Sequence, residues 1–369
     1  MQENNPPIRL SHLLLKAILL FALFNFACVF LGALPFGKLS LYNSLFPGRE
    51  RLPFGEVPQS YNLSPFDLDA MFASHVLAGA EKQPDEYRVL LIGDSSVWGT
   101  LLTPEETLAG QLNASPVPAC GKTVRAYNLG YPTLSLLKEL LLLDYALRYQ
   151  PDMVIWLTTL QSFPRDRQLT SPLVANNASR VRELIERYDL ALDPALVDPS
   201  FWDRTFLGQR RAVADFLRLQ IYGALWASTG IDQVYPKDYT PAQVDLEPSD
   251  EFQGLDAADQ GSLEEHLALD VLAAGMSAAD VPTLLVNEPM LISNGANSEI
   301  RYNFFYPRWA YDEYRDLLAQ RSADSGWSYF DFWDIVPPDE FTNSAVHLTP
   351  EGEALLAAGV AGAIQMTCR

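Results

Sequence analysis

Short apolar runs alternate with amphipathic stretches along most of this chain, and that alternation is typical of an α/β fold. Five runs have the length and continuous apolar character of buried strands: residues 88–94, 123–129, 152–158, 281–289 and 327–333. Helical patterns lie between and after them: a helix opening at Thr103, helices at residues 134–149, 262–274 and 307–321, and a last helix opening at Thr349. Because successive βα units align their strands, the sequence predicts a three-layer α/β/α domain around a mostly parallel sheet of five strands.

The alternation stops in the middle of the chain. Residues 163–262 carry no clear strand pattern, and helical patterns at 178–188 and 204–227 are followed by an acidic loop that contains prolines. We therefore expect a helical insertion here. It forms either a cap over the site or a solvated face with no part in it.

An apolar segment near the N-terminus has the length of a membrane-spanning helix. Residues 17–34 contain Asn25 as their only strongly polar member. A cleaved signal peptide is the alternative, but this run is longer than the ~7–15 residues usual for the apolar core of such a peptide. We predict an N-terminal tail and transmembrane anchor at residues 1–36, a stalk or packed strap at 37–84, and the α/β domain at 85–369.

The charges beside this segment leave its orientation nearly balanced. Arg9 and Lys16 precede it, whereas Lys38, Arg49 and Arg51 follow it. A short N-terminal tail before a first span commonly stays inside. We therefore expect a single-pass membrane protein with its domain on the extracytoplasmic side.

Charge and composition narrow the function classes. The 369 residues include 26 Lys and Arg against 46 Asp and Glu, a net charge of −20, so nucleic acid is not an expected partner. The three cysteines lie far apart, which excludes C-x-x-C zinc and redox motifs and leaves a disulfide between Cys120 and Cys368 as an open alternative. No two of the four histidines stand three to five residues apart, so we expect neither a metal site nor another cofactor.

Ser95 is the first candidate for chemistry. It stands in the sequence Gly-Asp-Ser-Ser directly after the first predicted strand, where open α/β sheets place their ligands. A serine needs a neighbouring base to act as a nucleophile at neutral pH. Without such a base, Ser95 would be an ordinary turn residue.

One of the four histidines has the right place in the chain to be that base. His12 borders the apolar N-terminal segment, His75 precedes the sheet, and His266 lies in a helix expected to expose it. His347 instead lies between the last strand and the last helix, where the chain can return to the carboxyl edge of the sheet. We predict a pair of Ser95 and His347, against the alternative that His347 is a solvated or capping residue.

Together these blocks resemble the SGNH/GDSL hydrolase superfamily over about residues 88–363. The family's first block, G-D-S after strand one, is matched by residues 93–95, and its last block, D-x-x-H, precedes the final helix. Its second block has a glycine after the second strand, which is matched by Gly130. The resemblance implies Ser95 as the nucleophile, His347 as the general base, and backbone N–H groups of Ser95 and Gly130 as donors to the oxyanion.

Two blocks depart from the family pattern. The third, G-x-N-D, would fall near residues 156–162, which contain no asparagine, so Gln161 or Thr159 would have to supply the second side-chain donor. In the last block Ser344 takes the place of the aspartate, and its neighbour Asn343 offers an oxygen that can orient an imidazole. The sequence therefore predicts a catalytic dyad, or a triad assisted by the asparagine.

Other polar residues near the predicted strand ends are candidates for the pocket. They are Asp94 beside the serine, Glu288 after the fourth strand, and Arg301 and Tyr302 in a cluster rich in aromatic residues. Such a cluster either lines a carbohydrate or acyl pocket or packs a loop. Glu288 and Asp334 are also the nearest acids that could replace the missing aspartate, with ordinary loop acids as the alternative.

The resemblance and the anchor together indicate a function. Membrane-tethered members of the superfamily commonly work beside membrane-bound O-acyltransferases on cell-envelope polymers. We therefore expect a serine esterase or O-acyltransferase that acts on an extracytoplasmic glycan or envelope polymer through a serine acyl-enzyme. The alternatives are a lipase or thioesterase held at the membrane, and a catalytically inactive binding or scaffold protein.

Overall fold

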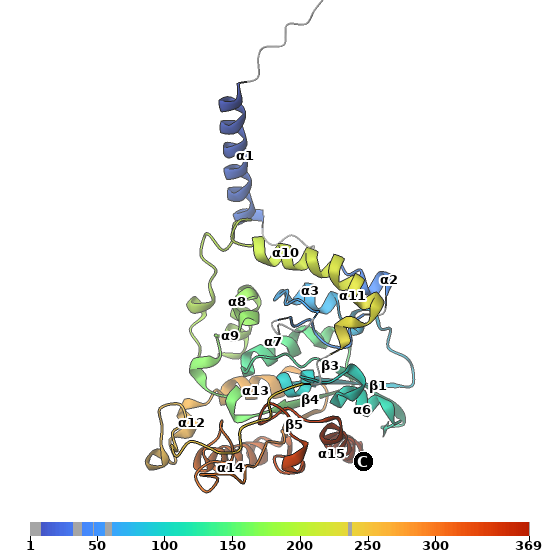
Figure 1. Cartoon of the computed structure of the whole chain (residues 1–369), viewed down its shortest axis with the longest axis vertical. Helices are drawn as coiled ribbons and strands as arrows, with labels where there is room; N and C mark the ends of the chain where they lie inside the picture. Colours follow the sequence, from blue (N-terminus) through green and yellow to red (C-terminus); the bar gives the residue numbers. More distant parts are fainter. Residues whose placement is uncertain (1–8, 32–38, 47, 56–60, 235–237, 369) are drawn as a thin grey trace, which may run out of the picture.

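The computed structural model describes residues 9–31, 39–46, 48–55, 61–234 and 238–368, and its central element is a mostly parallel sheet (Figure 1). The strands are β1 Glu86–Ile92, β2 Pro118–Ala119, β3 Lys122–Asn128, β4 Met153–Thr158, β5 Thr283–Asn287 and β6 Ser328–Asp331. Their order across the sheet is β2-β3-β1-β4-β5-β6. All neighbouring pairs are parallel except β2 with β3.

The predicted fold class is confirmed, but the predicted number of strands is one too few for the described chain. The strand that was missed, β2, is two residues long and forms an antiparallel edge beside β3. A segment this short has no hydrophobic periodicity that a sequence pattern could reveal.

Helices cover both faces of the sheet, as a buried parallel sheet requires. One face carries α6 (Leu108–Ala114) and α15 (Pro350–Thr367), and the other carries α7 (Leu136–Ala146), α13 (Leu269–Ala278) and α14 (Arg308–Ser325). Alternate residues of each strand point to the two faces, so that Leu91 packs with the first layer and Leu90 with the second. The sheet therefore separates two apolar cores.

Several helix boundaries differ from the predictions. The helix predicted from Thr103 begins as a short 3-10 turn, Pro104–Glu106, and the α-helix starts only at Leu108 with Thr107 as its N-cap. The helix predicted at 262–274 is two helices, α12 (Leu263–His266) and α13, with an extended residue, Leu267, between them. The last helix does begin as expected, with Thr349 as the N-cap and proline at the first position.

The chain before the sheet packs against the domain. It contains α2 (Tyr42–Leu45), α3 (Leu68–Ala73) and α4 (Val76–Gly79). Leu52, Met71 and Phe72 are completely buried in the core on the α7 side. Residues 32–38 and 56–60 of the predicted anchor and strap lie outside the described residues.

The insertion is helical in its first half. It contains α8 (Pro172–Asn176), α9 (Ala178–Tyr188), α10 (Arg210–Arg218), a π-helical turn (Leu219–Gly223) and α11 (Ala224–Thr229), and its described residues form no strand. Helices α8 and α9 lie near α7, whereas α10 and α11 lie between α1 (Leu10–Leu31) and the rest of the domain (Figure 1). The helices thus lie on the α7 side of the sheet. An extended part does approach the C-terminal loop, where Ala242 N–H donates to the carbonyl of Thr342 over 2.8 Å.

Short helical turns complete the described structure. They are α5 (Ser95–Trp98) and the 3-10 turns Leu147–Tyr149, Leu160–Ser162, Arg165–Arg167, Pro194–Val197, Ile231–Gln233, Ala257–Asp259 and Pro338–Glu340.

Two further features bear on where the protein resides. Within the described chain, one helical segment, Leu10–Phe30, is long and apolar enough to cross a membrane. It begins earlier than the predicted residue 17, and residues 32–34 of that prediction lie outside the described residues. A disulfide joins Cys120, beside β3, to Cys368 at the end of α15.

Candidate active site

The residues singled out in the sequence follow different parallel strands at one edge of the sheet. Ser95 follows β1, Gly130 follows β3, Gln161 follows β4 and Glu288 follows β5. His347 lies in the loop between β6 and α15. Parallel strands end at the same edge, which is where open α/β sheets form their ligand crevices.

The turn that carries Ser95 is held tightly against the sheet. Asp94 caps α5 by accepting a 2.8 Å hydrogen bond from the N–H of Ser96, and Ser95 is the first residue of the helix. A Cβ atom at Gly93 would lie 2.5 Å from a methyl group of Val97, so this close packing requires glycine. The local sequence therefore fixes the position of the serine hydroxyl.

Ser95 and His347 are in direct contact. The Oγ atom of Ser95 lies 2.8 Å from Nε2 of His347, and Nδ1 of the same ring lies 2.8 Å from Oδ1 of Asn343. Because an amide oxygen can only accept, this contact places the ring proton on Nδ1 and leaves Nε2 free to accept from the serine hydroxyl. The three side chains thus have the arrangement of a catalytic triad, with Ser95 in the position of the nucleophile, His347 in that of the base and Asn343 in that of the group that orients the base.

The surroundings of His347 keep its ring neutral. Burial lowers the pKa of His347 to about 4, against the smaller opposing effect of Asp94. An imidazole with this pKa is unprotonated at neutral pH, so it can take a proton from Ser95 without first losing one. Ser344 and Asp334 have no hydrogen bond to this ring, and Asp334 is exposed on the surface.

The candidate donors to an oxyanion differ in how they are engaged. The N–H of Gly130 donates to Oδ1 of Asn128 over 3.0 Å, and a Cβ atom at Gly130 would lie 2.3 Å from the nitrogen of Trp98. The hydroxyl of Thr159 lies 2.5 Å from that of Tyr306. Gly130 is therefore held close to the nucleophile turn, but its N–H already has an acceptor.

Gln161 is arranged differently. Arg167 donates to Oε1 of Gln161 over 2.8 Å, which fixes the orientation of the side-chain amide. The Nε2 group of Gln161 has no acceptor among the described residues, and the same holds for the backbone N–H of Ser95. Of the candidate oxyanion donors, the Nε2 group of Gln161 and the backbone N–H of Ser95 are therefore the two that remain available to a ligand.

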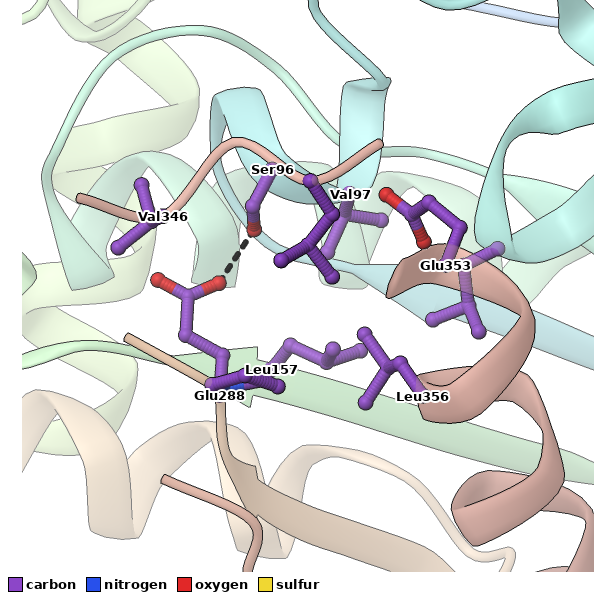
Figure 2. A pocket seen from close by; sticks show the side chains of 10 residues that line it. Ser96, Val97, Leu157, Glu288, Val346, Glu353 and Leu356 are labelled. Atoms are coloured by element: carbon purple, nitrogen blue, oxygen red, sulfur yellow. Dashed lines mark hydrogen bonds between the residues drawn. The ribbon is translucent and has the colours of Figure 1, made fainter. Parts of the chain in front are cut away.

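Glu288 contacts the nucleophile turn by accepting a hydrogen bond from the Ser96 hydroxyl (Figure 2). Burial and the nearby Asp94 raise the pKa of Glu288 well above its ordinary range. The side chains of Glu288, Val97 and Glu353 line a small cavity, and burial raises the pKa of Glu353 to about 8. With about 10 Å³ of space, this cavity is at the lower limit for one water molecule.

Arg301 and Tyr302 hold loops together. Arg301 donates to the carbonyls of Ser249 and Asn303, and the Tyr302 hydroxyl donates to Asp312 over 2.8 Å. Neither contacts the Ser95 and His347 pair. In the part of the chain that is described, no group of three or more His, Cys, Asp and Glu side chains is placed to hold a metal ion.

Sequence reasoning missed the buried pair Lys138 and Glu139 on α7. The ammonium group of Lys138 donates to the carbonyls of Gly93 and Tyr131, each over 2.9 Å, and to Glu139 over 3.1 Å. It therefore ties the nucleophile turn to the loop that follows β3. The interruption of an apolar helix by two adjacent charges was the sequence signal that could have revealed this pair.

Comparison with known proteins gives structural similarity only. No protein-family model matches the chain, and no curated protein matches it. An aryl esterase from M. smegmatis aligns at 14% identity, covering 76% of this chain and 99% of its own, with a TM-score of 0.34. A carbohydrate acetylesterase family member from Sinorhizobium meliloti aligns at 11% identity, covering 76% of this chain and 98% of its own, with a TM-score of 0.35. Similarity at this level carries no argument about the reaction.

Proposed function

We propose that this protein is an ester hydrolase or acyltransferase that works through a serine acyl-enzyme. The observation that carries the proposal is the unbroken contact from Ser95 Oγ to His347 Nε2, and from His347 Nδ1 to Asn343 Oδ1. A nucleophile, a base and an orienting group in hydrogen-bond contact are what acyl transfer by a serine requires.

In the proposed reaction Ser95 Oγ attacks the ester carbonyl while its proton passes to Nε2 of His347. Asn343 accepts from Nδ1–H throughout, which holds the imidazolium in place as it forms. His347 then gives the proton to the departing alcohol, and the acyl group remains on Ser95. Water or a second hydroxyl, deprotonated by His347, then attacks the acyl carbonyl, the bond to Ser95 Oγ breaks, and His347 returns the proton to Ser95 as the acid or new ester leaves.

The negative charge that develops on the carbonyl oxygen during the attack is stabilised by hydrogen-bond donors that are already in position. The backbone N–H of Ser95 and the Nε2 group of Gln161 fill this role in the proposal, because neither has another acceptor among the described residues. Gly130 N–H can join them only by sharing its bond to Asn128. Removal of one such donor in other enzymes costs about 10²–10³ in turnover.

The proposal places the domain outside the cytoplasm on a single membrane anchor. Segment Leu10–Phe30 has the length and hydropathy of a span, and the Cys120–Cys368 disulfide is of a kind that persists in oxidising compartments. An anchored extracytoplasmic esterase reaches acyl esters on glycans and other envelope polymers. Its expected substrate is therefore an O-acyl, commonly acetyl, group on such a polymer, and a membrane-bound O-acyltransferase is the expected partner.

Two assays with the full chain in detergent test the proposal. Release of p-nitrophenol from p-nitrophenyl acetate tests for an active serine, and release of acetate from an O-acetylated polysaccharide tests the substrate class. We expect both activities to be lost in Ser95→Ala, with Ser344→Ala as the matched control that retains them. Equal activity of Ser95→Ala and the parent chain would reject the mechanism.

A further inference from the structure

The continuous helical segment of residues 210–229 presents its large apolar side chains outward. Its exposed residues include Leu217, Ile221 and Leu225, each more than half exposed. Its buried residues are mostly small or polar: Asp215, Leu219, Gln220, Gly223 and Ala224. A helix on the surface of a water-soluble domain has the opposite arrangement, with its apolar stripe against the core.

One buried polar residue of this segment joins it to a distant part of the chain. The Gln220 side chain accepts from the N–H of Leu41 over 2.7 Å. Asp215, which is also buried, pairs with Arg218 one turn further along the same helix, over 2.8 Å. The contact with Leu41 is on the buried side of the segment and supports the orientation that exposes the leucines.

The chain just before this segment contacts the candidate membrane helix. Asn25 of α1 accepts from the N–H of Leu207 over 2.9 Å, and the rings of Phe24 and Phe206 lie 5.3 Å apart. Helix α10 runs crosswise to α1 beneath its end (Figure 1). If α1 spans a bilayer, a helix that runs crosswise to it lies along the bilayer surface.

The position of this contact along α1 matches the depth of the bilayer interface. Asn25 lies six residues before Leu31, the last residue of α1, which corresponds to about 9 Å at the usual helical rise. Amphipathic helices that lie in a membrane surface bury their apolar face by roughly 5–10 Å. The exposed Trp202 and Tyr222 are of the two residue types that concentrate at this level.

The charges along the segment suit an anionic lipid surface, in contrast to the acidic remainder of the protein. Arg204, Arg210, Arg211 and Arg218 are exposed. Residues 201–229 contain two acids, the exposed Asp203 and the buried Asp215, which pairs with Arg211 and Arg218, so the segment keeps a net positive charge. The whole chain has a net charge of −20. Arginine side chains can extend from such a helix to the lipid head groups while their stems cover apolar surface.

We propose that residues 201–229 form an interfacial membrane-binding surface, with Leu217, Ile221 and Leu225 inserted among the lipids, which holds the domain at a fixed height and orientation on the bilayer. This inference rests on the proposed insertion of α1 in a membrane and is independent of the esterase chemistry. We expect this face to bind a lipid bilayer, because it lies beside the proposed membrane helix and carries exposed arginines.

Depth-dependent fluorescence quenching in bilayer nanodiscs tests this surface. The full chain carries Cys28→Ser, so that a single cysteine introduced by Ile221→Cys or Leu225→Cys takes a bimane label while the disulfide stays intact. The discs contain phosphatidylcholine and phosphatidylglycerol, with or without a quencher on the upper acyl chain. We expect the quencher to reduce emission from either position by about twofold or more, because an apolar face buried by roughly 5–10 Å lies at the depth of the upper acyl chain.

Two further labelled positions are controls, one on the face of the molecule far from the proposed bilayer and one within α1. Leu355→Cys places the label on an exposed apolar position of α15, at the opposite end of the molecule from α1, and should show no quenching (Figure 1). Ile18→Cys, near the middle of α1, reports insertion of α1 in a second set of discs whose quencher is at the end of the acyl chain. Quenching at 18 but not at 221 or 225 would reject the proposed surface and favour a protein partner for this face, and absence of quenching at 18 would reject both the anchor and the surface. Ester hydrolysis measured on the same discs reports separately on the active site.

Discussion

Ser95 and His347 are separated by 252 positions in the sequence, yet their Oγ and Nε2 atoms lie 2.8 Å apart. The contact arises because β1 is central in the sheet and the loop before α15 returns to the same edge. Asn343 completes the arrangement from within that loop. The proposed mechanism therefore depends on three side chains: Ser95 at the start of α5, and His347 and Asn343 in the loop before α15. Each of these residues can be substituted without removing a residue of the hydrophobic core.

Asn343 is predicted to position the base. In Asn343→Ala the ring loses its acceptor at Nδ1 and can take the wrong tautomer, so we expect kcat for ester hydrolysis to fall about 10²-fold. Asn343→Asp should retain activity, and its negative charge should raise the pKa of His347 and move the pH–rate inflection upward. Asn343 is exposed, so neither change should lower the melting temperature appreciably. Equal kcat and an unshifted pH profile in both variants would contradict this role.

The pH dependence of kcat/KM is predicted to report the low pKa of His347. Its pKa of about 4 means that the base is unprotonated above roughly pH 5, so activity should rise with a midpoint near pH 4 and then stay level through neutrality. An ordinary histidine would give a midpoint near its usual value of about 6.5. Circular dichroism at each pH is the control for loss of fold, because a histidine with a lowered pKa also destabilises the folded state as the pH falls below 6.5. A midpoint near 6.5 with an intact fold would contradict the described environment.

Gln161 is predicted to donate to the oxyanion. Gln161→Ala should lower kcat by about 10²-fold with little change in KM, as expected for an interaction made only in the transition state. Arg167→Ala should produce a smaller loss of the same kind, because the amide would keep its position and lose the contact that orients it. An unchanged kcat in Gln161→Ala would exclude this residue and leave Gly130 as the second donor.

Glu353 is predicted to make the fold less stable as the pH rises. Its pKa is about 8 when folded and near 4.5 when unfolded, so the unfolded chain binds fewer protons between these values. The free energy of unfolding should then fall by up to about 1.4 kcal/mol per pH unit in this interval. Urea unfolding in detergent at pH 6 and pH 8 measures this effect, and Glu353→Gln should lose less stability between them than the parent chain. Identical losses in both proteins would show that Glu353 is not responsible.

The residues that matched a local pattern were predictable, and those that depend on packing were not. Ser95 and His347 could be found because each directly precedes or follows a recognisable element. In the sequence Ser344 takes the aspartate position and Asn343 is its neighbour, and only the structure shows that the Asn343 side chain reaches the ring. The two adjacent charges of Lys138 and Glu139 were a visible signal in the sequence, but the carbonyl groups of Gly93 and Tyr131 that accept from Lys138 could be identified only from the structure.

The orientation of the helices in the insertion could not be predicted from the sequence either. Its helical periodicity was visible, but periodicity does not reveal which side of a helix is buried. Gln220 and Asp215 are buried and Ile221 is exposed, and the contact of Gln220 with Leu41 holds the segment in this orientation. Only the folded structure shows that the apolar side is left exposed beside α1.

Covalent labelling by a fluorophosphonate tests the central claim most directly. The probe reacts only with a serine that a neighbouring base activates, so we expect intact-mass analysis of the full chain in detergent to show one adduct, on Ser95. Ser95→Ala and His347→Ala should both prevent labelling, while Ser96→Ala should still be labelled. A folded parent chain that takes no adduct, or that labels equally well in His347→Ala, would contradict an activated serine and favour a binding or scaffolding role.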